Sequence, residues 1–253
     1  MTFNAAEFGI LGPAFIAGLL VTATHVPLGM QVLERGIVFI DLAVAQVAGA
    51  GVIFADYLGW EPTGAAVQIA ALSAALSCAA LLTWTERRWP EVQEAMIGVV
   101  VVLASCLAIL ILAGNPHGSE HLKDLLSGQI LWVSTARLPF VALVYGVILA
   151  LWFWMRERLG RMGFYVLFAC AVTISVQLVG LFLVFSTLVI PALATFYSRR
   201  HRYLKAYSIG VLGYAAGLGL SLVIDLPSGA MIVCTMALAG GVIAVATGRR
   251  ASV

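Results

Sequence analysis

Charged residues are scarce in this chain. They make up 10% of its 253 residues, whereas an average soluble domain has about 25%. Apolar residues account for 62% of the sequence. A soluble domain of this size cannot bury so much apolar side chain, so most of the protein must lie in lipid. The net charge is only +2, which gives no support for a nucleic-acid partner.

Sequence motifs for enzyme chemistry are also lacking. The chain has no zinc-protease helix motif, no nucleophile elbow, no phosphate-binding P-loop and no glycine-rich dinucleotide loop. Its four cysteines form no CxxC pair and lie inside apolar runs, so we expect them to be small apolar helix residues. We therefore do not expect an enzyme, and if ATP drives this protein, the ATPase is another chain.

Long apolar runs are abundant. About 20 apolar residues cross the hydrocarbon core as a helix, and continuous apolarity favours helices over a barrel. A further uncharged run, 162–198, has 37 residues. As one helix it would be about 55 Å long, against about 30 Å of hydrocarbon. The seven runs of suitable length are 8–30, 36–55, 64–84, 95–114, 138–155, 206–224 and 228–247.

Basic residues indicate how the long run is arranged. Cytoplasmic loops of membrane proteins carry an excess of Lys and Arg, so we place the basic segments on the cytoplasmic side. The segments on either side of 162–198 then share a side, and the run must cross twice, turning between Gln177 and Gly180. Twelve of the 14 basic residues lie at positions 35, 87–88, 156–161, 199–205 and 249–250.

The predicted fold class is therefore an all-α, polytopic transmembrane helix bundle that forms a single domain over residues 1–253. We expect about nine spans, with the N-terminus outside and the C-terminus cytoplasmic. Eight spans are the alternative, if the first run or one short half is only partly inserted. The outer segments 56–63, 115–137 and 225–227 are acidic and carry two of the four histidines.

Three polar residues lie inside the predicted spans. Asp41 and Gln46 are in the second span, and His25 is in the first, two residues before Pro27. An ionisable residue at this depth costs roughly 3 kcal/mol and usually faces the protein interior for a function. Asp41 could instead reach water or Arg35, and His25 could bond a carbonyl that the proline frees. Asp41 and Gln46 are about 140° apart around a helix, so they do not share a face.

An outer segment carries a possible metal-binding group. His117 and His121 are four residues apart, with Glu120 and Asp124 nearby. On a helix, Asp124 would share a face with both histidines, and imidazole with carboxylate suits zinc and, less specifically, manganese or iron. The acidic outer face as a whole also suits a molecule that receives a cation outside; the alternative for that asymmetry is that the positive-inside bias alone removed Lys and Arg from the outer loops.

Small residues and a proline mark two later spans. Gly213 and Gly217 form a GxxxG pair, which predicts close helix packing within the chain or between protomers. Pro191 breaks a span, and broken helices often line transport sites.

Three stretches together resemble one family of membrane proteins. They are VLERGIVFIDLAVAQVAGAGVIFA (32–55), VQLVGLFLVFSTLVIPALAT (176–195) and GLGLSLVIDLPSGAMIV (217–233). All three are similar to segments of the permease subunits of metal-ion ABC importers, which serve zinc, manganese and iron. The resemblance runs through nearly the whole chain, including EHLKDLLSGQILWVS (120–134).

This resemblance implies a homodimeric permease in the bacterial cytoplasmic (inner) membrane. Its implied partners are a cytoplasmic ATP-binding subunit and an extracytoplasmic metal-binding protein. The divalent metal, most readily zinc and then manganese or iron, would be the transported substrate, with no permanently bound cofactor.

The resemblance also implies site residues. The metal pathway would include Asp41, Gln46 and His25, and the outer entrance His117, Glu120, His121 and Asp124. The ATPase would dock on cytoplasmic loops that carry Arg156, Arg158, Arg161, Arg199 and Arg200.

The chain departs from the family's pattern in two places. The family commonly places an Asp and a His four residues apart in the second span. Aligned on Gly51, this chain has Leu42 and Gln46 at those positions, and Asp41 comes one residue early. The cytoplasmic segment 156–163 is also shorter than the family's ATPase-docking stretch. A proton-coupled secondary transporter using Asp41 is one alternative function, and a membrane enzyme with a metal on His117 and His121 is another.

Overall fold

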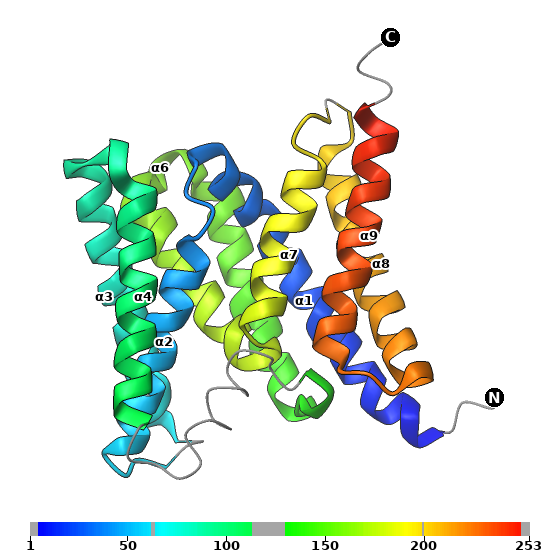
Figure 1. Cartoon of the computed structure of the whole chain (residues 1–253), viewed down its shortest axis with the longest axis horizontal. Helices are drawn as coiled ribbons and strands as arrows, with labels where there is room; N and C mark the ends of the chain where they lie inside the picture. The colour runs from blue at the N-terminus through cyan, green and yellow to red at the C-terminus, as the bar shows by residue number, and fades with distance from the viewer. Residues whose placement is uncertain (1–4, 62–63, 113–129, 199, 249–253) are drawn as a thin grey trace. The chain divides into compact units, whose positions relative to one another are not determined.

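The computed structural model of the chain describes residues 5–61, 64–112, 130–198 and 200–248, and the regular structure in these ranges is all helical. Eight of the described helical segments are long and apolar enough to cross a membrane. A ninth apolar helix, Leu181–Ala194, is shorter. The predicted all-α, polytopic bundle is thereby confirmed (Figure 1).

The helices follow the predicted apolar runs closely, with most ends extended by a few residues. Gly160, with φ 58° and ψ −161°, interrupts helix α6, so that this element supplies two candidate spans, Thr135–Met155 and Gly160–Val179. Three short 3-10 helices, η1 (Pro90–Val92), η2 (Ile130–Trp132) and η3 (Thr135–Arg137), lie between the longer ones. The long elements are α1 (Ala5–Arg35), α2 (Ile40–Tyr57), α3 (Ala65–Arg88), α4 (Gln93–Leu112), α6 (Leu138–Val179), α7 (Leu181–Ala194), α8 (Arg202–Ile224) and α9 (Ser228–Gly248).

The long uncharged run turns where the charge pattern predicted. Helix α6 ends at Val179, and α7 begins at Leu181. The residue between them, Gly180, has φ 87°, a backbone conformation that side chains with a Cβ rarely adopt. With 14 residues, α7 is about 21 Å long, which is less than the roughly 30 Å of the hydrocarbon core.

The chain divides into two compact units, which are described separately. Unit 1 comprises residues 1–35, 126–147 and 177–253, and unit 2 comprises 36–125 and 148–176. The expectation of one permease domain over 1–253 stays a prediction.

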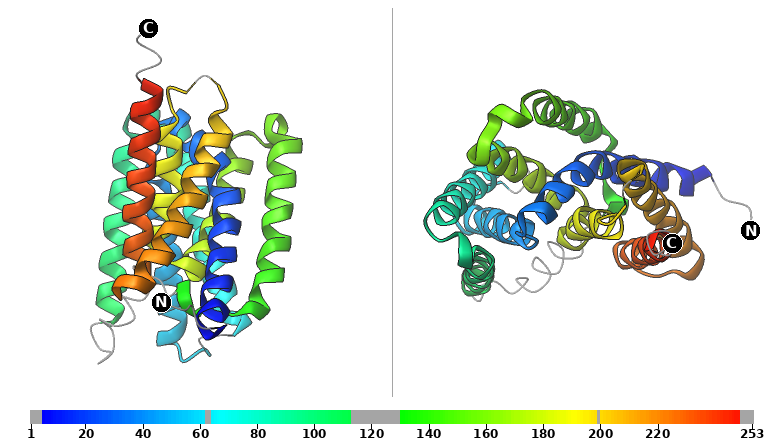
Figure 2. Two further views of the ribbon diagram at one scale, coloured as in Figure 1. Left: turned by 90° about the vertical axis from the view of Figure 1, so that its right-hand side faces the viewer. Right: turned by 90° about the horizontal axis from the view of Figure 1, so that it is seen from above.

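In unit 1, α8 and α9 lie side by side, and small residues bring their backbones together (Figures 1 and 2). A Cβ at Gly213 would come within 2.7 Å of the Cβ of Met236, and one at Gly217 would overlap the backbone of Ile232. In lipid, helices associate through such close packing rather than through the hydrophobic effect. The predicted role of the GxxxG pair is confirmed as packing within the chain.

In unit 2, α2 packs against both α3 and α4 (Figure 2). A Cβ at Gly51 would lie 3.0 Å from the carbonyl oxygen of Ala70, so a side chain there would force α2 and α3 apart. A buried hydrogen-bond pair joins α3 to α4, because the Thr85 hydroxyl donates to Oε1 of Gln93 at 2.9 Å. Asp41 and Gln46 therefore lie on a helix, α2, that packs tightly against its neighbours.

Candidate functional site

His25 is completely buried in α1, and its hydrogen bonds define its tautomer. Nδ1 lies 3.0 Å from the carbonyl oxygen of Val21 and 3.0 Å from the hydroxyl of Thr24. A carbonyl can only accept, so Nδ1 carries the proton and donates to Val21. The Nε2 atom then carries a lone pair, and it is buried with no hydrogen-bond partner among the described residues. Metal-binding histidines characteristically use a carbonyl in this way to orient the ring.

The proline near His25 does not account for this geometry. Pro27 has no N–H, so it frees the carbonyl four residues earlier in α1, which belongs to Ala23. The hydroxyl of Tyr207, from α8, donates to that carbonyl at 3.2 Å. His25 bonds the carbonyl of Val21 instead. The alternative in which His25 bonds the carbonyl freed by Pro27 is therefore wrong.

Asp41 is completely buried in the first turn of α2. Its carboxylate lies beside the backbone N–H groups of Asp41 and Leu42 but outside hydrogen-bond geometry, so both oxygens lack a partner among the described residues. The partial positive charge of a helix N-terminus favours an anion at this position. An unpaired buried carboxylate is otherwise costly, which is typical of a site that meets a cation.

A second carboxylate lies near Asp41 in unit 2. Glu94, at the start of α4, interacts electrostatically with Asp41, and its Oε1 accepts the backbone N–H of Phe39 at 3.3 Å. Phe39 is the residue before α2 and offers no side-chain cap, so Glu94 caps the helix from a neighbouring element. The N-terminal end of α2 therefore combines two acidic groups, of which the sequence analysis identified only Asp41.

Gln46 lies on α2 as predicted and is half-buried. It follows Asp41 by five residues on a regular helix, so the two side chains leave the helix on different faces. The structure therefore does not bring Asp41 and Gln46 together as a pair of ligands from one face.

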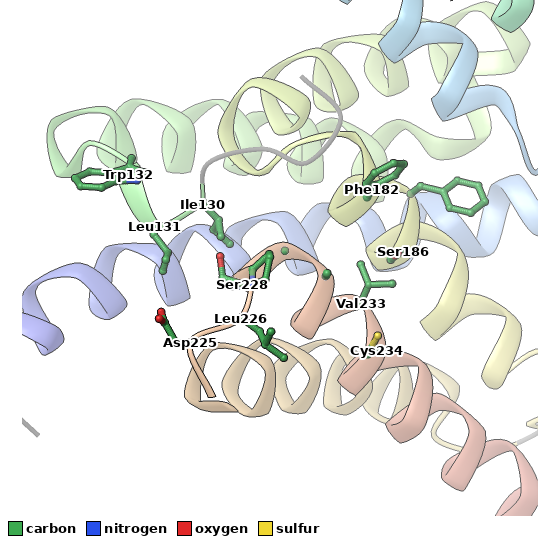
Figure 3. A pocket seen from close by; sticks show the side chains of 14 residues that line it. Ile130, Leu131, Trp132, Phe182, Ser186, Asp225, Leu226, Ser228, Val233 and Cys234 are labelled. Atoms are coloured by element: carbon green, nitrogen blue, oxygen red, sulfur yellow. The ribbon is translucent and has the colours of Figure 1, made fainter. Parts of the chain in front are cut away.

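A pocket of about 750 Å³ opens in unit 1 between three segments distant in the sequence (Figure 3). Its walls come from η2, from the first two turns of α7 and from the turn between α8 and α9. Ile130 and Leu131 point toward the turn that carries Asp225. Asp225 adopts a left-handed conformation with φ 56°, and Ser221 donates to the carbonyl of Leu226 at 2.6 Å, which fixes this turn.

The lining of this pocket is mainly apolar, with one carboxylate and a few small polar groups. The Asp-x-Pro-Ser-Gly stretch identified in the sequence forms one wall, beginning at Asp225. Ser186, from α7, was not singled out by sequence reasoning, because nothing local distinguishes it from other small residues of an apolar helix. The predicted outer-entrance residues lie outside the described residues: His117, Glu120, His121 and Asp124.

The predicted docking residues occupy two different settings. Arg158 is exposed on α6, and Arg161 lies 3.8 Å from a carboxylate oxygen of Glu86. Arg200 is exposed in the turn between α7 and α8. The side chain of Arg156 and the whole of Arg199 lie outside the described residues.

Among the described residues, no three His, Cys, Asp or Glu side chains come together as a metal-binding group. His25 in unit 1 and Asp41 in unit 2 are thus separate candidate ligands. Each presents a buried atom with a free lone pair.

These features match a known family. The chain belongs to the ABC 3 transport family, whose pattern it matches over residues 7–165 and 158–247. It is therefore a multi-pass membrane permease of a metal ABC transporter, and the ATPase resides in a partner chain. Family membership decides against the secondary transporter and the membrane enzyme as alternatives.

Individual proteins are similar to this chain over most of its length. The chain is 25% identical, over 93% of its length and 90% of the relative's, to the uncharacterized membrane protein slr2045 of Synechocystis sp.. Its fold is similar to a chain of PsaBC from Streptococcus pneumoniae, solved in complex with Fab, with a TM-score of 0.74 at 21% identity over 94% of this chain and 92% of that chain. A metal-chelate type ABC transporter in an inward-facing conformation is similar with a TM-score of 0.58 at 13% identity, over 98% of this chain and 80% of that chain.

Proposed function

We propose that this permease moves a divalent metal ion into the bacterial cytoplasm, with zinc as the first candidate and manganese or iron next. It would lie in the cytoplasmic (inner) membrane. The metal is the transported substrate in this proposal, and no permanently bound cofactor takes part. Family membership supports the transporter class, and the chemistry of the buried polar groups supports the metal class.

The observation that carries the proposal is the preset imidazole of His25. Its Nδ1 donates to Val21, so Nε2 is neutral and free to bind a cation. Calcium and magnesium prefer oxygen ligands, whereas imidazole suits zinc, iron and related ions. A buried imidazole on the pathway therefore favours a transition metal.

Oxygen donors on α2 are a second group of candidate ligands. Asp41 offers an unpaired carboxylate, and Gln46 offers a neutral amide oxygen where the family commonly has imidazole. Carboxylate and amide oxygens are compatible with manganese and iron as well as with zinc. We propose that metal reaches these groups from an outer entrance that includes His117, Glu120, His121 and Asp124.

The working assembly in this proposal is a homodimer of the permease with a pair of cytoplasmic ATP-binding subunits. An extracytoplasmic metal-binding protein would deliver the ion to the outer face. ATP binding and hydrolysis would switch the permease between outward-open and inward-open states. The basic loops at Arg156, Arg158, Arg161, Arg199 and Arg200 are the proposed contacts with the ATPase.

The test is uptake of radioactive zinc, manganese and iron into proteoliposomes that contain the full assembly. We expect uptake that requires both ATP and the ATPase chain. Uptake that continues without ATP, or with the permease alone, would overturn the ABC mechanism. Transport of none of the three metals would overturn the proposed substrate class.

Two variants probe the pathway. We expect His25→Phe to reduce uptake by about tenfold or more, since the change removes the metal-binding nitrogen. Thr22→Val is its control, because Thr22 is also a buried polar residue of α1 but its hydroxyl is used by the Gly18 carbonyl. Gln46→His should shift selectivity toward zinc, and unchanged selectivity and rate would exclude Gln46 as a ligand.

A further inference from the structure

The turn between α7 and α8 is held firmly to the end of α7. The backbone N–H of Phe196 donates to Leu193 at 3.1 Å, and that of Ser198 donates to Thr195 at 2.9 Å. The Thr195 hydroxyl reaches back to the carbonyl of Pro191 at 2.7 Å. These bonds satisfy the carbonyls that a helix C-terminus leaves free, so the turn moves with α7.

The same turn is held to the start of α8. Lys205 donates from its ammonium to the Ser198 hydroxyl at 2.6 Å, and Ser198 donates to the carbonyl of Arg200 at 3.2 Å. His201 has φ 56° and brings the chain into α8. The described part of the turn is thus bonded on both sides.

An ion pair and aromatic contacts complete the structure. Arg202 bonds Glu34, at the end of α1, with 2.8 Å between Nη1 and Oε1. Its guanidinium carbon lies 5.8 Å from the ring centre of Phe196, and that ring meets Tyr197 edge to face at 5.1 Å. Three helices of unit 1 therefore support one aromatic pair.

This aromatic pair is presented outward. Tyr197 is 84% exposed and Phe196 is 41% exposed, while Thr195 and Ser198 beside them are buried. Arg200, also exposed, adds positive charge next to the rings. Exposed aromatic residues with arginine on a rigid support are typical of the anchors that dominate protein interfaces.

The other candidate docking segment, 156–163, has a different backbone arrangement. Around Gly160 the helix α6 is interrupted at one residue only, and it continues directly into the next span. Arg158 is exposed there, but Arg161 is near Glu86. In the described backbone of 156–163, no separate helix lies across the end of the span to form a platform.

We infer that the turn between α7 and α8 is the principal docking element for the ATPase subunit, with Tyr197 inserted into an apolar groove that has an acidic rim. The inference rests on the proposed function for the cytoplasmic location of the turn. It also gives α7 a role, because the opposite end of this 14-residue helix lines the outer pocket with Phe182 and Ser186. A movement of the turn on ATPase binding would therefore be passed to that pocket through α7.

The experiment measures the affinity of the purified ATPase subunit for the permease in nanodiscs, without any metal. We expect Tyr197→Ala to weaken binding by about 30-fold or more, the loss typical of a central aromatic anchor, and Tyr197→Phe to retain most of it. Trp89→Ala is the control, because Trp89 is a 44% exposed aromatic residue at the cytoplasmic end of α3. Arg158→Ala, in the α6 segment, should weaken binding less than Tyr197→Ala, because we expect that segment to be a secondary contact.

Unchanged affinity in Tyr197→Ala would overturn the inference, as would equal losses in Tyr197→Ala and Trp89→Ala, which would indicate a membrane-interface role. A large loss in Arg158→Ala alone would assign docking to the α6 segment. Hydrogen exchange on the wild-type permease gives a second measurement if a variant fails to fold. Protection of 195–201 on ATPase binding supports the inference, and no protection there overturns it. Failure of metal uptake with intact ATPase binding would count against the proposed substrate and not against this docking element.

Discussion

Replacing Asp41 by asparagine should make the permease more stable and less active. The carboxylate is fully buried with no hydrogen-bond partner among the described residues. A charge at such a position costs roughly 3 kcal/mol, and the N-terminus of α2 returns up to about 1 kcal/mol. A neutral amide without a partner still costs about 1 kcal/mol. Asp41→Asn should therefore gain about 1 kcal/mol, and by the usual scaling for a chain of this size its Tm should rise by about 2–4 °C.

The assay is thermal unfolding of the purified permease in detergent, followed by a thiol-reactive dye that reports exposure of the buried Cys78 in a background where the other three free cysteines, Cys106, Cys170 and Cys234, are replaced by Ala. The control is Asp56→Asn, at the other end of α2, where the half-buried carboxylate should give a change within about 0.5 kcal/mol. Metal uptake by Asp41→Asn should fall, since the carboxylate is retained against its cost in stability. A Tm for Asp41→Asn below that of the wild type would refute the reasoning, because it would mean that the carboxylate has a stabilising partner.

Two further predictions concern stability. Tyr207→Phe should cost about 1 kcal/mol because it leaves the partly buried carbonyl of Ala23, in α1, without its side-chain donor. Its cost should largely vanish in a Pro27→Ala background, where the new N–H fills that role, and additive effects in a thermal double-mutant cycle would contradict this account. Gly18→Val should cost several kcal/mol or prevent folding, because any Cβ there overlaps the ring of Tyr214. Gly12→Val, on the same helix with nothing within 4 Å, should be tolerated, and equal losses in the two variants by size-exclusion analysis would count against the packing explanation.

The apolar helices and their order along the chain followed from the sequence, because each helix in lipid must be apolar by itself. Each crossing helix must satisfy its own backbone and present apolar side chains, whatever its neighbours are. The basic segments then divided 162–198 into two pieces, and the break at Gly180 confirms it. The GxxxG pair at Gly213 and Gly217 was also predictable as a packing surface, although not its partner helix, α9.

The site was only partly predictable. His25 and Asp41 stood out because polar residues are rare in these spans. The sequence could not predict that Nδ1 of His25 donates a hydrogen bond to the carbonyl of Val21. Nor could it predict that the Tyr207 hydroxyl donates to the carbonyl freed by Pro27. Those facts depend on side-chain rotation and on a helix almost two hundred residues away.

Sequence alone therefore determined that this chain is a multi-pass helical membrane protein, approximately where its helices lie, and that the run 162–198 turns near Gly180. Tertiary structure decided which buried polar atoms lack a hydrogen-bond partner among the described residues and which segments line the pocket at Asp225. It also decided that hydrogen bonds hold the turn that carries Tyr197 to both α7 and α8. The physical reason is that lipid solvates each apolar helix individually. Contacts between helices depend on small residues and single hydrogen bonds, whose partners lie far apart along the chain.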